Sequence, residues 1–324
     1  MKAAIHDAFG DPAKVLATAE APLPEPRPGQ VRLRVILTPI HNHDLWTVRG
    51  SYGYKPELPA IGGSECVGVI DALGGGVEGL VPGQRVAAAG LFGSWAGYVL
   101  ASAKGVVPLP DTIPDEAAAQ LIAMPFSAAT LLDFLNVSPG DWVVQNAANG
   151  AVGKVLAGLA AAKGINVINL VRREKTVAEM AALGLPNTIA TTEGWKDRAR
   201  ALTGGAPIRA AVDSIGGKAS GDLLSLLADD GLLVSFGSME GEPMQIPSGD
   251  LIFKQAVIKG FWGSKVSAAM DGETRKRLMT ELVTQVVAGK VRLPVQAIFP
   301  LDQIADAVTA SLTPGKAGKV LLKP

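Results

Sequence analysis

The stretch VVQNAANGAVGKVLAGLAAAKG, residues 143–164, decides the fold. It opens with a short apolar run typical of a buried strand, passes through a turn of small residues, and continues into an Ala/Leu-rich segment that predicts a helix over 151–163. A strand, a glycine-containing turn and a helix in this order let backbone N–H groups and the helix N-terminus face a pyrophosphate. Ala148 replaces the first glycine of the G-x-G-x-x-G pattern, and only Gly150 and Gly153 remain. An ordinary tight turn between strand and helix is therefore the alternative interpretation.

The segments that follow repeat this alternation of strand and helix. The predicted strands are 166–171, 187–190, 210–215, 231–238 and 256–263, and the predicted helices are 176–183, about 195–202 and 218–228. Apolar strands separated by helices predict a parallel sheet that is covered on both faces. We therefore expect a doubly wound Rossmann domain over 119–264.

The first third of the chain has a different texture, rich in Pro, Gly and β-branched residues. Short strands separated by turn residues are predicted at 31–37, 65–74, 83–90, 95–101 and 105–110. A helix is predicted at 273–288, and the segment 291–324 returns to strand, helix and strand. We expect these last strands to join the first domain, which then comprises 1–118 and 265–324. The predicted fold class is α/β, with the doubly wound parallel sheet inserted into a β-rich domain.

Composition excludes several classes of function. The chain has 324 residues, 48% of them hydrophobic and 19% charged, with a formal net charge of zero. Such a balance favours neither nucleic acid nor an anionic membrane as a partner. The single cysteine, Cys66, lies in an apolar strand and is predicted to be a core thiol, which excludes an internal disulfide and a four-cysteine zinc site. The N-terminus lacks a long apolar region and no run approaches a membrane span, so we expect a cytoplasmic location.

Arg172 and Arg173 follow the second strand of the predicted sheet. An NAD-binding unit usually has an acidic residue here, which holds the ribose 2′-OH. A guanidinium instead attracts a 2′-phosphate, so the pair favours NADPH over NADH. The alternative is a solvated Arg-Arg pair at a helix start. The loops 214–220 and 236–241 follow later strands and should also line the cofactor, because ligands bind at the carboxyl ends of parallel strands.

Several stretches together resemble a known family over essentially the full length. They are GSYGYKPELPAIGGSE (50–65), VVQNAANGAVG (143–153), INLVRR (168–173), SIGGKAS (214–220), GSM (237–239) and LIFKQAVIKGFWGS (251–264). They are similar to the zinc-free branch of the medium-chain dehydrogenase/reductase superfamily, and closest to its mitochondrial-type 2-enoyl thioester reductases. The resemblance implies a GroES-like catalytic domain around the Rossmann domain. It also implies a homodimer, with AVIKGFWG (256–263) as the edge strand that pairs across a two-fold axis.

The resemblance places cofactor-binding positions along the chain. The phosphate-loop positions fall on Asn149, Gly150, Ala151, Val152 and Gly153, and the 2′-phosphate positions fall on Arg172 and Arg173. Later cofactor positions fall on Phe236, Gly237, Ser238, Met239, Phe261, Trp262, Gly263, Ser264 and Lys319. The family often has a further Arg where this chain has Glu174, and it has an asparagine where this chain has Met124. The second departure affects the polar contacts on the substrate side.

The metal positions of the zinc-dependent branch are replaced. They fall on His41, on Ser64 in Gly-Gly-Ser-Glu, and on about Met124. Ser and Met do not replace the Cys and His ligands of zinc, so no catalytic metal is predicted. His43 and Asp44 beside His41 leave a metal at HNHD as the alternative.

Reduction of an activated C=C bond can proceed without a metal but needs a proton donor, and the resemblance places the family's proton-donating tyrosine on Tyr52. Hydride addition to the β carbon of an α,β-unsaturated thioester leaves an enolate, which must be protonated at the α carbon. A phenol, with an ordinary pKa of about 10, holds its proton until that basic enolate forms. Tyr54 is the alternative donor, since only the family register distinguishes the two.

The sequence therefore predicts NADPH-dependent reduction of activated C=C bonds, with 2-enoyl thioesters as the leading substrate class. An NADPH:quinone oxidoreductase is the nearest alternative. A zinc alcohol dehydrogenase and a non-catalytic NADPH-binding protein are the remaining readings. The sequence leaves open the acyl length, the carrier, and the choice among enoyl thioester, enone and quinone.

Overall fold

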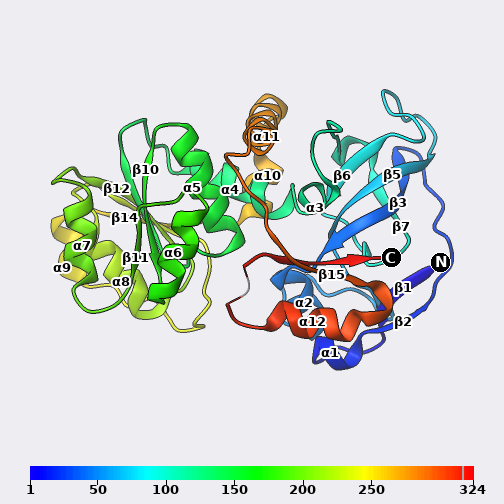
Figure 1. The fold of residues 1–324 in the computed structure, drawn as a ribbon, viewed down its shortest axis with the longest axis horizontal. Helices are drawn as coiled ribbons and strands as arrows, with labels where there is room; N and C mark the ends of the chain where they lie inside the picture. The colour runs from blue at the N-terminus through cyan, green and yellow to red at the C-terminus, as the bar shows by residue number, and fades with distance from the viewer. Residues whose placement is uncertain (316) are drawn as a thin grey trace. The chain divides into compact units, whose positions relative to one another are not determined.

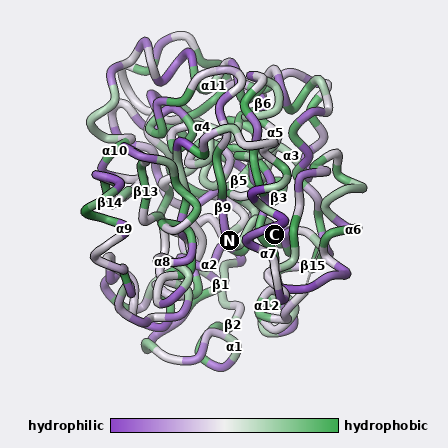
Figure 2. Tube along the Cα trace, turned by 90° about the vertical axis from the view of Figure 1, so that its left-hand side faces the viewer, coloured by the Kyte–Doolittle hydropathy of each residue, from purple (hydrophilic) through white to green (hydrophobic). Residues whose placement is uncertain are grey.

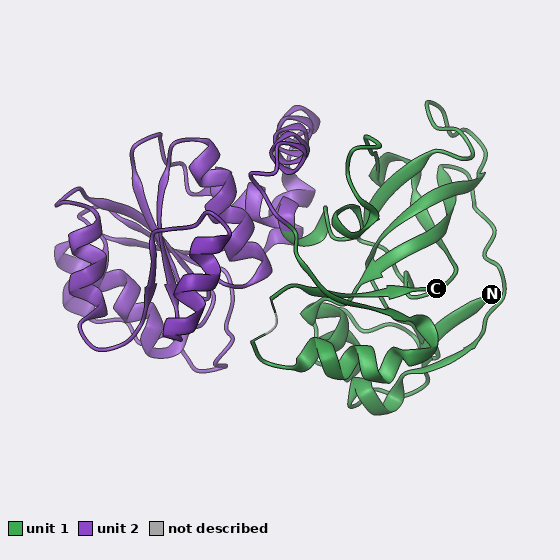
Figure 3. Ribbon diagram, viewed as in Figure 1, with its two compact units in different colours: residues 1–124, 293–324 green, residues 125–292 purple. Residues whose placement is uncertain are grey.

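The computed structural model describes residues 1–315 and 317–324, and these form two compact units. Unit 1 comprises residues 1–124 and 293–324, and unit 2 comprises residues 125–292 (Figure 3). The predicted limits, 1–118 with 265–324 and 119–264, differ from these units over 119–124 and 265–292. The domain limits remain a prediction.

Unit 2 contains a six-stranded parallel sheet with strand order β11-β10-β9-β12-β13-β14 (Figure 1). Its strands are β9 (Trp142–Gln145), β10 (Asn166–Val171), β11 (Thr188–Ala190), β12 (Ile208–Asp213), β13 (Leu232–Ser235) and β14 (Val257–Gly260). Its helices are α5 (Ala151–Ala162), α6 (Glu174–Ala182), α7 (Trp195–Leu202), α8 (Gly217–Leu226), α9 (Ser248–Phe253), α10 (Gly263–Ala269) and α11 (Gly272–Val287), with α4 (Ala123–Phe134) leading in from unit 1. The strand order reverses between β9 and β12, which is where doubly wound sheets bind ligands.

The strands of unit 2 are apolar because both faces of the sheet are covered (Figure 2, hydrophobic segments in green). Val144 on β9, Ile168 on β10 and Leu233 on β13 are fully buried in one core cluster. The predicted doubly wound α/β sheet is confirmed.

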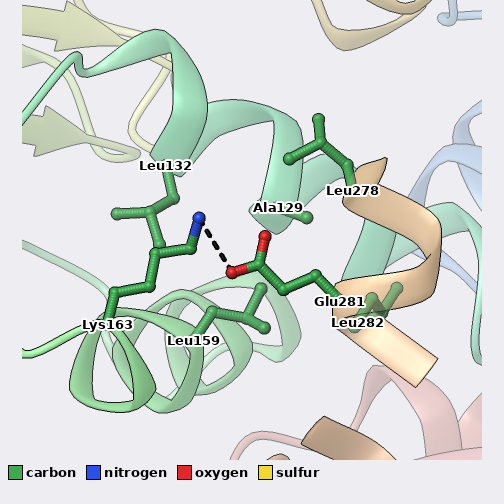
Figure 4. A pocket seen from close by; sticks show the side chains of 7 residues that line it. All are labelled: Ala129, Leu132, Leu159, Lys163, Leu278, Glu281 and Leu282. Atoms are coloured by element: carbon green, nitrogen blue, oxygen red, sulfur yellow. Dashed lines mark ion pairs between the residues drawn. The ribbon is translucent and has the colours of Figure 1, made fainter. Parts of the chain in front are cut away.

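Helix α11 packs against α5 within unit 2, which explains why 265–292 groups with this unit. Lys163 and Glu281 form an ion pair of 2.9 Å between Nζ and Oε1. This pair lies over a small apolar pocket to which α4, α5 and α11 contribute leucines (Figure 4). The leucines are Leu132, Leu159, Leu278 and Leu282.

Unit 1 is built around a mostly antiparallel sheet with strand order β15-β16-β3-β5-β6-β8, and β7 pairs with β3. A smaller sheet has the order β2-β1-β4. The strands are β1 (Lys2–His6), β2 (Ala17–Glu20), β3 (Gln30–Pro39), β4 (Ala60–Ile61), β5 (Glu65–Leu73), β6 (Arg85–Ala89), β7 (Tyr98–Ser102), β8 (Val106–Pro108), β15 (Val295–Pro300) and β16 (Lys319–Lys323). The helices are α1 (Pro12–Val15), α2 (Asn42–Arg49), α3 (Asp115–Ala118) and α12 (Ile304–Leu312), with 3-10 turns at Ala103–Gly105 and Leu301–Gln303.

The strand-helix-strand segment β15-α12-β16 completes the sheet of unit 1, as predicted. Strand β16 pairs antiparallel with β3, where Leu321 faces Pro39 and Leu322 faces Thr38. Val320, Leu321 and Leu322 are fully buried.

Cys66 on β5 is fully buried, and burial raises the pKa of its thiol. The prediction of a core thiol is thereby confirmed. Among the described residues, no helix combines the length and the apolar character that a membrane span requires.

Candidate functional site

The turn between β9 and α5 presents uncapped backbone donors. Gly150 is the N-cap of α5, and among the described residues no side chain caps the first turn of this 12-residue helix. The first N–H groups of a helix have no intrahelical partner, and the helix dipole favours an anion beside them. Gly153 lies against Ala148, since a Cβ at Gly153 would stand 2.6 Å from the Ala148 carbonyl oxygen and 2.8 Å from its Cα. This glycine permits the close packing that the turn requires.

A buried carboxylate, Asp213, organises the neighbouring loop at the switch point. Its Oδ1 accepts hydrogen bonds from Asn146 Nδ2 at 2.7 Å and from the backbone N–H of Ile215 and Gly216 at 2.9 and 3.1 Å. Its Oδ2 accepts from Ser220 Oγ at 2.5 Å. Asn146 Oδ1 accepts in turn from the Ser214 N–H at 2.7 Å. This network fixes the loop after β12, and sequence reasoning missed it. The available signal was the polar residues that end two apolar strands.

Arg172 and Arg173 lie directly after β10, where a 2′-phosphate site is predicted. Arg172 is exposed, Arg173 is half-buried at the N-cap of α6, and neither guanidinium forms an ion pair within the part of the chain that the structure describes. The carboxylate of Glu174 accepts a hydrogen bond of 2.9 Å from Thr192 Oγ1. Glu174 is therefore engaged with Thr192, and the two arginines keep their positive charge available.

The remaining predicted positions of unit 2 follow β13 and β14. A Cβ at Gly237 would stand 3.0 Å from the Ser214 carbonyl oxygen, so the two loops approach closely. Phe261 is buried, while Met239 and Trp262 are 68% and 66% exposed. Phe261 and Trp262 line an open depression of about 890 Å³. The loops at 149–153, 172–173, 236–239 and 261–264 all follow the carboxyl ends of parallel strands, and so they lie along one edge of the sheet.

A buried His–Glu pair lies in unit 1, near the predicted proton donor. His41 Nε2 and Glu65 Oε2 are 2.7 Å apart, and both side chains are fully buried. Glu65 Oε1 accepts the backbone N–H groups of Ile122 and Ala123 at 2.5 and 2.9 Å. The carboxylate therefore joins the start of β5 to the start of α4. His41 Nδ1 is buried without a hydrogen-bond partner among the described residues.

Burial favours the uncharged form of both side chains in this pair. It raises the pKa of Glu65 to about 7, against the opposing effects of the Ala123 and Ile122 N–H groups and of the Lys319 charge. Burial also lowers the pKa of His41 well below its ordinary value, and Lys319 adds to that shift. Lys319, at the start of β16, donates to the Ile40 carbonyl at 3.4 Å. The predicted cofactor lysine thus lies beside the His–Glu pair.

A second cluster of polar side chains, His43, Asp44 and Ser64, lies near Tyr52. His43 Nε2 lies 2.8 Å from Ser64 Oγ, and Ser64 Oγ donates to Asp44 Oδ1 at 2.6 Å. The His43 ring stacks on the His41 ring with centroids 5.1 Å apart. The Tyr52 ring centroid lies 5.8 Å from that of His43, and the two rings are tilted by 31°. Tyr54 instead packs on Phe92, and its side chain is 43% exposed. The structure thus separates the two candidate tyrosines by their surroundings.

His41 and Ser64, which the resemblance places at zinc-ligand positions, each bond to other side chains. His41 is held by Glu65, and Ser64 is held by Asp44 and His43. Within residues 1–315 and 317–324, no cluster of three or more His, Cys, Asp or Glu has an arrangement that could hold a metal ion. Zinc independence remains a prediction.

Comparison with known proteins assigns both units to known families. Residues 27–111 match the alcohol dehydrogenase GroES-like domain, and residues 151–282 match the zinc-binding dehydrogenase model. The human mitochondrial enoyl-[acyl-carrier-protein] reductase is 34% identical over 99% of this chain and 88% of its own length. The chain belongs to the medium-chain dehydrogenase/reductase family.

Solved structures of this family agree over the whole chain. A mycobacterial quinone oxidoreductase superposes with a TM-score of 0.89 at 26% identity, and a mycobacterial protein in complex with NADPH superposes with a TM-score of 0.88 at 26% identity. Both comparisons cover 100% of each chain. The predictions of a GroES-like domain with an inserted Rossmann domain and of an NADPH-dependent oxidoreductase are confirmed, and the family includes both enoyl reductases and quinone reductases.

Proposed function

We propose that this medium-chain dehydrogenase/reductase reduces the activated C=C bond of 2-enoyl thioesters at the expense of NADPH. The observation that carries the proposal is the placement of Tyr52. It is the half-buried tyrosine of its loop and lies against the His43 ring, whereas Tyr54 is exposed on Phe92. A tyrosine at this place supplies the proton that alkene reduction requires and that simple hydride acceptance by a quinone does not.

The residues of unit 2 fit NADPH. The uncapped first turn of α5 offers N–H groups to a pyrophosphate, and a side chain at Gly153 would fill the space against Ala148. Arg172 and Arg173 offer guanidinium groups to the 2′-phosphate. When bound, NADPH supplies the hydride that is added to the β carbon of the substrate. The loops 236–239 and 261–264 are the proposed contacts of unit 2 to the rest of the cofactor. Lys319 is the cofactor contact proposed for unit 1.

Tyr52 performs the proton step in this proposal. The enolate formed by addition at the β carbon has its electron pair shared between oxygen and the α carbon. The Tyr52 hydroxyl transfers its proton to the α carbon, so a new C–H bond forms and a phenolate remains. The phenolate regains a proton from solvent before the next turnover. The phenol gives up its proton only to a base as strong as the enolate, which couples protonation to reduction.

Quinone reduction is the second candidate, and the similarity to a mycobacterial quinone oxidoreductase over the full chain favours it. A quinone accepts hydride at a ring oxygen or carbon and needs no tyrosine at the α carbon. Both candidates share the same cofactor site. The role of Tyr52 separates them.

The test is NADPH oxidation measured with crotonyl-CoA, longer enoyl-CoAs, enones and quinones, for the wild type, Tyr52→Phe and Tyr54→Phe. We expect Tyr52→Phe to lower kcat/KM for crotonyl-CoA by about 100-fold or more, because general acid catalysis contributes 10²–10⁴-fold. Tyr54→Phe, the matched control, should retain its activity. Equal turnover of crotonyl-CoA by Tyr52→Phe and wild type would remove the proton-donor assignment. Turnover of quinones alone would establish the second candidate.

The edge strand of unit 2 supports the proposed homodimer. β14 is the last strand of its sheet, and Val257 on it is 52% exposed, with Ile252 and Phe253 of α9 at 64% and 85%. An open apolar sheet edge favours pairing with another copy. Sedimentation velocity decides between monomer and dimer, and fractionation of cell extracts tests the proposed cytoplasmic location.

A further inference from the structure

The His43 ring is a neighbour of two other rings of unit 1, those of His41 and Tyr52. One face stacks on His41 at 5.1 Å with a 16° angle between the rings, and Tyr52 lies 5.8 Å away. The Tyr52 hydroxyl makes no hydrogen bond with the residues that the structure describes. In the proposed reaction this hydroxyl is therefore available to the substrate.

His43 is itself held in one orientation by Ser64 and Asp44. The single proton of the Ser64 hydroxyl goes to Asp44 Oδ1 at 2.6 Å, so Ser64 Oγ accepts from His43 Nε2 at 2.8 Å. The Asp44 carboxylate is fixed in turn, because its Oδ2 accepts the His41 backbone N–H at 2.9 Å. One hydrogen bond and one ring stack thus hold the imidazole directly, and two further hydrogen bonds fix Ser64 and Asp44 behind it.

Ser64 occupies the position of a zinc-binding histidine in the metal-dependent branch, and here it anchors His43. Asp44, His41, Glu65, Tyr52 and Lys319 are the titratable groups near the imidazole. Tyr52 among them is the proposed proton donor, and its ring centroid lies 5.8 Å from that of His43.

We propose that His43 is a positioning residue for Tyr52, anchored by Ser64 and Asp44, and that it fixes the direction in which the phenol delivers its proton. The inference rests on the proposed function, because it concerns the proton step. A donor held by a rigid neighbour keeps its proton within reach of the α carbon, and a displacement of about 1 Å can cost about 100-fold in rate. We expect hydride transfer and cofactor binding to be independent of this neighbour.

The test compares His43→Ala, which removes the ring, with His43→Phe, which keeps a flat ring between His41 and Tyr52. We expect His43→Ala to lower kcat for crotonyl-CoA by about 10- to 100-fold, with the KM for NADPH and the rate of quinone reduction unchanged. His43→Phe should recover part of that loss. The double variant His43→Ala/Tyr52→Phe should be no slower than Tyr52→Phe, since both changes affect one step. Thr47→Ala, on the same helix, is the matched control; its side chain bonds only to the His43 carbonyl among the described residues.

A second readout does not depend on turnover. The chain has three tyrosines, so 3-fluorotyrosine labelling gives three ¹⁹F resonances, and Tyr52→Phe assigns one of them. In His43→Ala the Tyr52 resonance should shift and narrow as the ring gains freedom; an unchanged resonance overturns the inference. Equal losses in crotonyl-CoA reduction, quinone reduction and thermal stability would show a merely structural role and also overturn it. Full crotonyl-CoA activity in Tyr52→Phe removes the proposed function, whereas a crippled Tyr52→Phe beside an active His43→Ala removes this inference alone.

Discussion

The edge of the unit 2 sheet that we propose binds NADPH, with the loops 149–153, 172–173, 236–239 and 261–264 (the cofactor edge), differs in kind from the polar cluster of unit 1 around His41, His43, Ser64 and Glu65. The first consists largely of backbone: an uncapped helix start, a glycine packed on Ala148, and loops after parallel strands. The second consists of side chains drawn from separate segments, with Glu65 bonded to His41 and to the N–H groups of Ile122 and Ala123. A site made of backbone tolerates many side chains, whereas a site made of side chains depends on each of them.

The largest effect is expected at Arg172 and Arg173, where the proposed NADPH site of unit 2 uses side chains instead of backbone groups. Replacing both Arg172 and Arg173 by Ala should raise the KM for NADPH by about 100-fold, because each charge-assisted hydrogen bond contributes about 1.5–3 kcal/mol. The KM for NADH should change little, since that cofactor lacks the 2′-phosphate. The measurement is the ratio of the two kcat/KM values. Arg209→Ala, an exposed arginine on β12, is the control. An unchanged NADPH/NADH ratio in the double variant would place the 2′-phosphate elsewhere.

The backbone character of the cofactor edge is tested by one methyl group. Gly153→Ala should lower the free energy of unfolding by about 2 kcal/mol and weaken NADPH binding about tenfold or more, because its Cβ would overlap Ala148 and force the turn apart. Gly272→Ala is the matched change at a helix start, where a Cβ meets no atom within 4 Å. It should be neutral or slightly stabilising. Urea unfolding and NADPH titration measure both variants, and equal effects at the two positions would contradict the packing argument.

The smallest effect concerns the side-chain cluster of unit 1 and appears as a dependence on pH. Glu65 has a pKa of about 7 in the folded protein against 4.5 for an ordinary glutamate. Between these values the folded chain keeps a proton that the unfolded chain has released. The contribution of Glu65 to stability is therefore complete below about pH 4.5 and is lost as the pH rises to 7. His41 acts in the opposite direction below its unfolded pKa of 6.5, because the unfolded chain takes up a proton there first.

Comparison with Glu65→Gln isolates this contribution, since glutamine does not titrate. The free energy of unfolding of the wild type relative to Glu65→Gln should fall by on the order of 1–3 kcal/mol between pH 4.5 and 7, and stay level above that. Denaturant midpoints at a series of pH values give the two curves. Parallel curves would mean that Glu65 titrates near its ordinary value and that burial does not control the pair.

What the sequence could predict follows the same division. Apolar runs between helices predicted β9 to β14, and Gly153 was found because a backbone turn leaves a pattern of small residues. The bond from Glu65 to Ile122 left no such pattern, because its partners are 57 residues apart and the acceptor binds backbone N–H groups that any residue carries. His43 and Asp44 are visible in the sequence as neighbours of His41. Their hydrogen bonds to Ser64 join segments that are far apart in the sequence, and so no local pattern predicts them. The same holds for Asp213 and Asn146.

The position of strand β16 has a consequence for the order in which the two units fold during synthesis. The strand lies between β15 and β3 in the sheet of unit 1, and Val320, Leu321 and Leu322 are fully buried there. All of residues 125–292 leave the ribosome before this strand does, so unit 2 can fold while the end of β3, at Thr38 and Pro39, still lacks its pairing with β16. During that interval the apolar residues of unit 1 that β16 covers are exposed to other chains. If synthesis stalls before residue 319, the nascent chain has a folded Rossmann unit and an incompletely folded unit 1. The exposed apolar surface of unit 1 would then bind chaperones.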